Sequence, residues 1–162
     1  MNKLQLVLVS MLIGVNSSVY AEQHMENKSH TMGIQQQVDK DLLIENARVK
    51  ATIPGVKVSA GYFKLTNNSD QTMTFTHAET SVAKFTEYHT MEMDNNKMLM
   101  RKMDAVIIPA HESILFKPKG KHLMFMGLNQ RFIAGESINV TLFRKNGESY
   151  NVNLPVIDMN AH

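Results

Sequence analysis

The residues of this sequence with the clearest chemical potential lie between positions 89 and 126, where thioether and imidazole side chains are concentrated. Seven of the thirteen methionines fall in this segment, together with three histidines. The residues are His89, Met91, Met93, Met98, Met100, Met103, His111, His122, Met124 and Met126. Thioether sulfur and imidazole nitrogen together select a soft cation such as Cu(I), whereas carboxylates and carbonyls suit Mg, Ca or Mn. Because the chain has no cysteine, such a site has to take its sulfur from methionine.

The elements that would position these ligands are short β-strands. From residue 42 onward, short runs rich in β-forming residues alternate with turn residues, and no convincing amphipathic helix appears. The expected strands are 43–51, 56–65, 72–78, 85–91, 97–103, 106–108, 113–117, 122–126, 137–144 and 149–156. Asn146-Gly147 lies between the last two and is a strong hairpin signal. This pattern favours an all-β fold, a β-sandwich or a small barrel.

Strand geometry places some of the candidate ligands together. Successive side chains of a strand point to opposite faces, so His122 and Met124 share one face while Phe125 points to the other. A fold that brings the strands of His89 and Met100 beside that face would direct four soft or borderline ligands at one ion. The spacing along the chain does not by itself establish this convergence.

The other methionines and histidines also have structural interpretations. A single methionine is usually a flexible gap-filler in a core. Methionines interpreted as core or surface residues are Met73, Met103 and Met159. Those interpreted as packing around the ligands, or as a sulfur-rich surface, are Met91, Met93, Met98 and Met126. His77 and His111 are interpreted as solvated histidines near turns.

The chain divides into an export signal, a tail and one domain. Residues 1–21 are typical of a secretory signal peptide, with Lys3, an apolar run and the small-residue cleavage site Val19-Tyr20-Ala21. We expect a polar flexible tail over 22–41, one β-domain over 42–157 and a C-terminal tail over 158–162. No later run reaches the ~18 apolar residues of a membrane-spanning helix, so no membrane span is expected.

Charge and motifs exclude several classes of function. The formal net charge is +2 and the basic residues are scattered, which gives no electrostatic footprint for nucleic acid. An exported chain without cysteine has no disulfide framework, so packing or a bound ligand has to stabilise it. No nucleophile and base constellation, phosphate-binding glycine loop or zinc motif is recognisable, and we therefore expect no enzyme.

The tail offers a second metal site if cleavage follows Ala21. The mature chain would then begin Glu22-Gln23-His24, whose free amine, two amide nitrogens and imidazole can surround Cu(II) in a square plane. The alternative interpretation is a disordered tail in which histidine and methionine merely occur. Both interpretations remain open.

The spacing of the main candidate ligands resembles that of a known family. Periplasmic copper chaperones of the PCuAC family have a His, ten residues, a Met, twenty-one residues and then His-x-Met, which this chain matches without a gap at His89, Met100 and His122-Leu123-Met124. The surrounding sequence is also similar, at Gly61-Tyr62, Thr66-Asn67, Ile108-Pro109-Ala110, Lys117-Pro118-Lys119-Gly120 and Met124-Phe125-Met126-Gly127-Leu128. The resemblance covers about residues 42–157.

The resemblance implies a cupredoxin-like β-barrel that binds Cu(I) through His89, Met100, His122 and Met124 in the periplasm. It further implies delivery of copper toward the CuA centre of cytochrome c oxidase, with oxidase subunit II or another copper chaperone as the partner. One departure is His111-Glu112, where the family usually has glycines.

Two other classes of function remain as alternatives. One is a copper buffer or resistance protein without a dedicated acceptor, and the other is a structural or adhesive β-domain with a methionine-rich core. Blue-copper electron transfer is disfavoured, because such a site needs a cysteine ligand.

Overall fold

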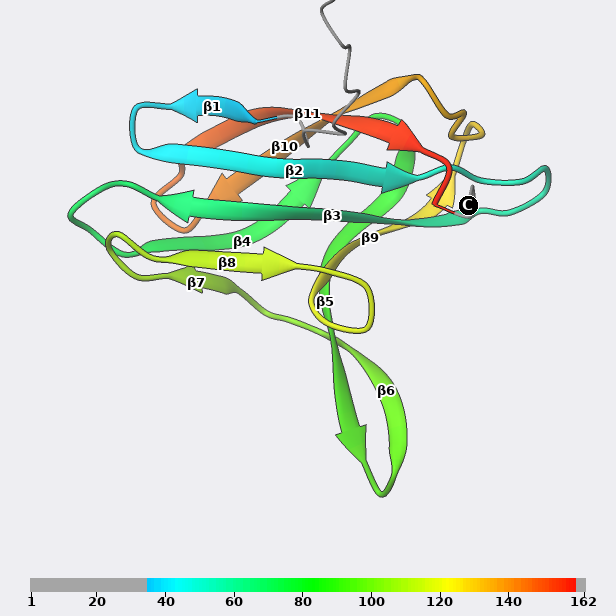
Figure 1. Cartoon of the computed structure of the whole chain (residues 1–162), viewed down its shortest axis with the longest axis horizontal. Helices are drawn as coiled ribbons and strands as arrows, with labels where there is room; N and C mark the ends of the chain where they lie inside the picture. Colours follow the sequence, from blue (N-terminus) through cyan, green and yellow to red (C-terminus); the bar gives the residue numbers. More distant parts are fainter. Residues whose placement is uncertain (1–34, 160–162) are drawn as a thin grey trace, which may run out of the picture. The chain divides into compact units, whose positions relative to one another are not determined.

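The computed structural model describes residues 35–159, which form eleven β-strands and no helix (Figure 1). The strands are β1 (Gln36–Asp39), β2 (Leu42–Lys50), β3 (Val58–Asn67), β4 (Met73–Glu79), β5 (Ala83–Asp94), β6 (Lys97–Lys102), β7 (Val106–Ile108), β8 (Ser113–Phe116), β9 (His122–Leu128), β10 (Ser137–Arg144) and β11 (Ser149–Ile157). The described residues contain no helix that could cross a membrane. The predicted signal peptide and most of the predicted N-terminal tail lie outside the described range.

Seven of these strands close into a barrel. Their order is β2, β11, β10, β4, β5, β9 and β3, and β3 pairs again with β2. Within this ring β2 and β11 are parallel and the other neighbours are antiparallel. The remaining strands pair with ring members: β1 with β2, β8 with β3, β7 with β4 and β6 with β5. The prediction of an all-β fold is confirmed.

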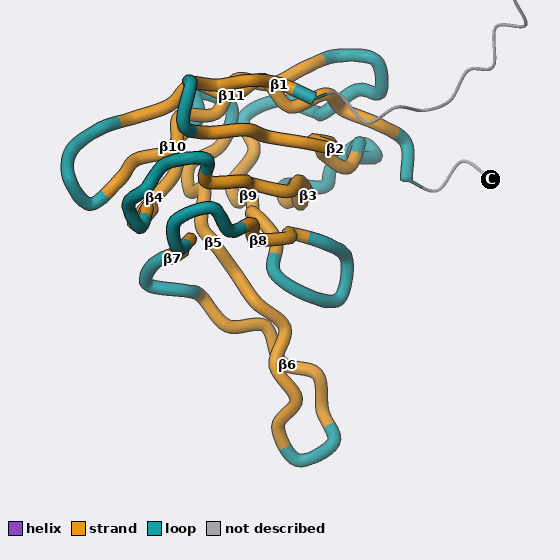
Figure 2. The backbone as a smooth tube through the Cα atoms, turned by 60° about the vertical axis from the view of Figure 1, so that its left-hand side comes forward, coloured by secondary structure: helices purple, strands orange, loops and turns teal. Residues whose placement is uncertain are grey.

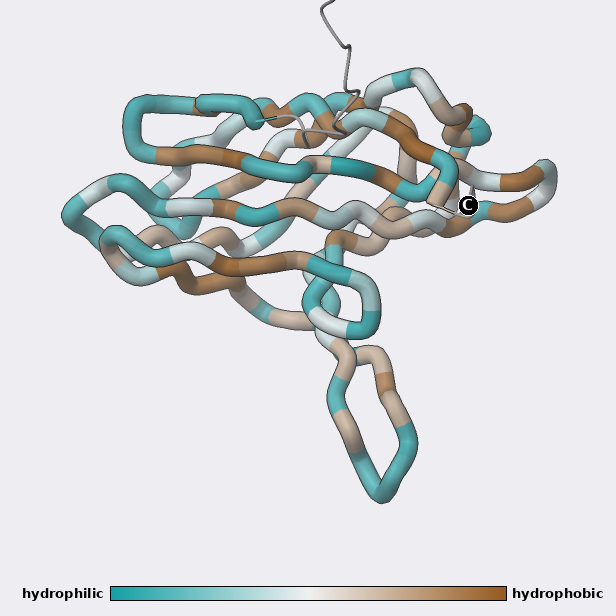
Figure 3. The backbone as a smooth tube through the Cα atoms, in the orientation of Figure 1, coloured by the Kyte–Doolittle hydropathy of each residue, from teal (hydrophilic) through white to brown (hydrophobic). Residues whose placement is uncertain are grey.

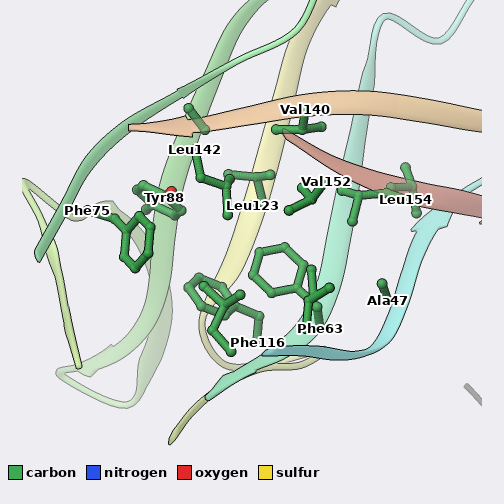
Figure 4. Packing of buried hydrophobic residues seen from close by; sticks show 14 of the residues in the cluster. Ala47, Phe63, Phe75, Tyr88, Phe116, Leu123, Val140, Leu142, Val152 and Leu154 are labelled. Atoms are coloured by element: carbon green, nitrogen blue, oxygen red, sulfur yellow. The ribbon is translucent and has the colours of Figure 1, made fainter. Parts of the chain in front are cut away.

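The core lies inside the barrel, because alternate residues of the ring strands point inward. Figure 3 shows that both hydrophobic and hydrophilic residues occur along β2 and β3, and the burial of β3 alternates from one residue to the next. Leu123 and Phe125 of β9 are fully buried on the inner side. Figure 4 shows Phe63 against Phe116 in this core, with ring centroids 4.6 Å apart. Burial of these apolar side chains is the main source of stability in a chain without disulfides.

The N-terminal boundary of the domain differs from the prediction. The sequence predicted a flexible tail over 22–41, but Gln36–Asp39 forms β1 and pairs antiparallel with β2. The side chain of Gln36 accepts a hydrogen bond from the backbone N–H of Asn153 at 3.1 Å, and Val38 packs against the core. A polar segment can pair in this way because the edge of β2 offers backbone hydrogen bonds that require no apolar pattern.

The hairpin predicted at Asn146-Gly147 is confirmed and connects β10 to β11. The backbone N–H of Gly147 donates to the carbonyl of Arg144 at 3.1 Å, and the N–H of Arg144 donates to the carbonyl of Glu148 at 2.8 Å. Gly147 has a φ of 90°, which lies in the left-handed region. This geometry is typical of a three-residue hairpin turn, whose last residue favours glycine.

A second hairpin, formed by β5 and β6, extends from the barrel wall (Figures 1 and 2). β5 pairs with β9 as far as His89 and then continues to Asp94 beside β6. The turn consists of Asn95 and Asn96, with φ of 48° and 62°, as a tight two-residue hairpin turn requires. β5 is therefore longer than the predicted 85–91 strand. His89 lies where the β5–β6 hairpin leaves the barrel.

Candidate metal centre

The two histidines of the predicted ligand set face each other across neighbouring strands. His89 of β5 is the register partner of His122 of β9, so their side chains project from the same face of the sheet. Their ring centroids are 5.8 Å apart and the ring planes are inclined by 47°. The inward direction on β9 is taken by Leu123 and Phe125, so both imidazoles stand on the outer face of the barrel.

The imidazole of His122 is fixed with one nitrogen free. Its Nδ1–H donates to the backbone carbonyl of Gly120 at 3.0 Å, since a carbonyl oxygen can only accept. Nε2 then carries the lone pair. This atom is buried and has no hydrogen-bond partner among the described residues. His122 is only 5% exposed, so an unpartnered nitrogen here is costly unless something binds it.

The imidazole of His89 is fixed in the opposite sense. Its Nε2–H donates to the carboxylate of Glu87 at 3.0 Å, which leaves the lone pair on Nδ1. Nδ1 is also buried and has no partner in the described part of the chain. Glu87 accepts a second hydrogen bond from Lys102 at 2.7 Å. The hydrogen bond from Lys102, and then that from His89, lower the pKa of Glu87 below its usual value, so Glu87 is an ionised acceptor near neutral pH.

The methionines lie on the same outer face. Met124 is the register partner of Glu87 on β5 and of Ala60 on β3, and it follows His122 by two residues. Met100 of β6 is paired with Met91 of β5. The chain reaches this arrangement because the tight turn of the β5–β6 hairpin places β6 beside β5, and β5 lies beside β9.

An apolar pocket of about 500 Å³ opens on this face. Its lining includes four of the candidate soft ligands: Met91, Met100, His122 and Met124. The loop after β2 and the strand β3 supply most of the other walls, with Ile53, Val56 and Tyr62 among them. His89 is not part of the lining, but its ring lies beside that of His122, which does line the pocket. The pocket therefore gathers imidazole and thioether groups within an otherwise apolar surface.

This donor set suits a soft cation. The described residues contain no group of three or more His, Cys, Asp and Glu side chains that could hold a metal ion. The donors gathered on this face are imidazole nitrogen and thioether sulfur, a combination of ligand types that suits Cu(I). The carbonyl of Gly120 and the carboxylate of Glu87 orient the two rings, as the outer partners of metal-binding histidines commonly do.

Two groups on this face, the carboxylate of Glu87 and the backbone carbonyl of Gly120, were not predicted. Glu87 precedes His89 by two residues, so strand periodicity could have indicated that the two share a face. Gly120 contributes through its backbone carbonyl, for which the sequence carries no signal. Met91 was interpreted as packing around the ligands, and it lines the pocket beside Met100.

The remaining candidates lie elsewhere. Met126 is the register partner of Phe85 and lies outside the pocket lining. His77 stacks on the ring of Phe143 at 4.4 Å, and the exposed His111 pairs with Asp70 at 2.9 Å. The predicted Cu(II) site of Glu22, Gln23 and His24 falls outside the described residues.

The fold matches that of a known class of domain. The barrel has the cupredoxin-like fold of PCuAC domains. The copper-bound PCuAC domain from PmoF2 superposes with a TM-score of 0.64 at 15% identity, over 77% of this chain and 98% of that one. Apo-DR1885 from Deinococcus radiodurans gives a TM-score of 0.59 at 25% identity, over 97% and 98%. CuI-DR1885 from the same organism gives 0.56 at 28% identity, over 86% and 87%. The resemblance to PCuAC proteins inferred from the sequence is confirmed.

Sequence comparison also assigns the chain to a family. This chain belongs to the LpqE-like family, whose model matches residues 42–156. The protein Lxx21020 of Leifsonia xyli subsp. xyli is 30% identical over 119 residues, which are 73% of this chain and 70% of that protein. Both the family and Lxx21020 are described as lipoproteins.

Proposed function

We propose that this protein is an exported copper chaperone that binds Cu(I) through His89, Met100, His122 and Met124 and passes it to another protein. The observation that carries the proposal is the pair of facing imidazoles. Each has one nitrogen held by a hydrogen bond to Glu87 or Gly120 and the other nitrogen buried without a partner. Metal coordination would satisfy both buried nitrogens at once.

The solved relatives support copper as the ion. The PmoF2 structure is described as copper-bound and one of the DR1885 structures as CuI-bound. The two thioethers proposed as ligands agree with Cu(I), because soft ligands select the monovalent ion. We assign the same ion to this chain, and a Cu(I) cargo requires no redox step for binding or release.

The exposure of the sulfur ligands favours transfer over permanent storage. Met100 is 46% exposed on the β5–β6 hairpin, whereas His122 is 5% exposed at the barrel wall. An acceptor could replace Met100 first and the buried imidazole last, so the ion would be exchanged one ligand at a time. Thioethers are neutral and carry no proton, so their exchange needs no proton transfer.

The proposed acceptor is the CuA centre of cytochrome c oxidase subunit II, or another copper chaperone, in the periplasm. The description of the family as lipoprotein-like supports an exported location. The signal peptide over 1–21 and the Cu(II) site at Glu22, Gln23 and His24 remain predictions. N-terminal sequencing of the mature protein tests both, because the Cu(II) site needs Glu22 as the first residue.

A transfer assay separates the chaperone from a copper buffer. The Cu(I)-loaded mature protein is mixed with apo acceptor, the soluble CuA domain of subunit II, and copper is measured in both proteins after they are separated. A chaperone is expected to transfer its copper faster than the acceptor gains copper from a small-molecule Cu(I) complex of equal affinity. Retention of the copper, or transfer no faster than from that complex, would favour the buffer.

Glu87→Ala is expected to weaken Cu(I) binding by about 10-fold to 100-fold, because the carboxylate orients His89 and makes its ring a better donor. Competition with a coloured Cu(I) chelator measures the affinity. Glu92→Ala is the matched control, since Glu92 is an exposed residue of the same strand on the opposite face. Equal affinities of the two variants would show that Glu87 has no role in metal binding.

A further inference from the structure

The outer part of the β5–β6 hairpin carries two exposed thioethers that the proposed centre does not use. Met93 and Met98 are register partners, so their side chains lie on the same face of the two-stranded ribbon. They are 70% and 48% exposed. Partners directly opposite in antiparallel strands have Cβ atoms about 5 Å apart, and methionine has three rotatable bonds. Both sulfurs can therefore reach one ion between them.

Hydrophobic packing does not account for this pair. Most neighbouring positions of the hairpin are polar or charged, at Glu92, Asp94, Asn95, Asn96 and Lys97, and the apolar Leu99 pairs with Glu92 on the other face of the ribbon. A solvated strand favours threonine or another β-branched residue, and methionine has no special preference for strands. Two exposed methionines in one register pair contribute little to the stability of the barrel, because that stability comes from the buried core. The property common to both side chains is a soft thioether sulfur, one in each.

The exposed pair continues toward the proposed centre. The next register pair on the same face is Met91 with Met100, two residues closer to the barrel, and both line the pocket. Two residues of a strand span about 7 Å, so the two methionine pairs are separated by a short step that flexible side chains can bridge. Four thioethers in two consecutive pairs thus lead from the tip of the hairpin to the pocket.

We infer that Met93 and Met98 form a second, weaker binding site for a soft monovalent cation, which loads the centre through Met91 and Met100. This inference rests on the proposed function and extends it to the route of uptake. The ion is Cu(I) throughout. A bond from copper to Met98 breaks as a bond to Met100 forms, and neither sulfur nor metal changes its oxidation state. Two neutral thioethers exposed to solvent should bind the ion less tightly than the four ligands of the proposed centre.

The site is tested by titrating Ag(I), a redox-inert analogue of Cu(I), into the full mature chain labelled with ¹³C at its methionine methyl groups. We expect the Met100 and Met124 signals to move during the first equivalent. When more than one equivalent of silver has been added, we expect the Met93 and Met98 signals to move, both over the same range of silver concentration. Because each methyl group is observed separately, failure of the main centre would appear at Met100 and Met124 and failure of the second site at Met93 and Met98.

The loading role is tested with Met93→Leu, Met98→Leu, which keeps the apolar bulk and removes both sulfurs. We expect the double variant to reach the wild-type affinity for the first Cu(I) but to take it from a coloured chelator complex several-fold more slowly. Met103→Leu is the matched control, since Met103 follows β6 and packs against the core. Unmoved Met93 and Met98 signals, or equal loading rates, would overturn the inference.

Discussion

Replacing Met100 and Met124 together with alanine is expected to weaken Cu(I) binding by about 100-fold or more, which corresponds to at least ~2.7 kcal/mol. The change removes both sulfurs from the proposed four-ligand centre and leaves two imidazoles, so the ion loses its two softest donors. The barrel should stay folded, because both methionines lie on its outer face. Competition titration against a Cu(I) chelator measures the affinity of the mature protein and the variant side by side.

Met126→Ala is the control for this experiment. Met126 lies on β9, on the same face as Met124 and two residues beyond it, but it does not line the pocket. We expect this variant to bind Cu(I) as tightly as the wild-type protein. Wild-type affinity in the double variant would contradict the assignment of the two sulfurs. The neighbouring Met91 would then be the sulfur ligand to test next.

Phe125→Ala is expected to lower the free energy of unfolding by about 3–5 kcal/mol, the usual cost of deleting a buried aromatic ring. Phe125 is fully buried and meets Phe132 edge to face, with ring centroids 5.7 Å apart. Its ring also lies against the backbone of β3, where a Cβ added at Gly61 would be 3.1 Å from the ring. Urea denaturation of the metal-free protein measures the change.

The comparison for this variant is Phe85→Ala on the neighbouring strand β5. Phe85 is exposed on the outer face, so the same chemical change should cost less than about 1 kcal/mol. A similar cost for both substitutions would contradict the assignment of Phe125 to the inner face of β9. Met124, its neighbour in sequence, would then have to be reconsidered as an outward-facing residue.

The strand pattern made part of this site predictable. Alternation along β9 correctly separated His122 and Met124 from Phe125, because the side-chain period of a strand depends only on local geometry. The pairing of His89 with His122 was not predictable in this way. It depends on which strands become neighbours in the barrel and in which register, and both are set by contacts between residues far apart in the chain.

Other features lacked a local signal. β1 has no apolar periodicity and forms because β2 offers a free edge. The end of β5 beyond the predicted strand, Glu92-Met93-Asp94, has no strand-forming residues, but the Asn95-Asn96 turn holds it beside β6. The carbonyl of Gly120 belongs to the backbone, so no residue type announces its role in orienting His122. In each case a backbone group supplies the contact that side-chain patterns do not reveal.

The proposed donor atoms lie outside the barrel interior, so loss of the metal should not unfold the protein. Small zinc domains collapse when their metal leaves, because ion binding supplies their folding energy. Here Leu123 and Phe125 are packed in the core on one side of β9, and the proposed ligands His122 and Met124 lie on the other side, so metal binding and folding would depend on different side chains. The metal-free protein should therefore stay folded and resist proteolysis. One molecule could then bind and transfer copper repeatedly.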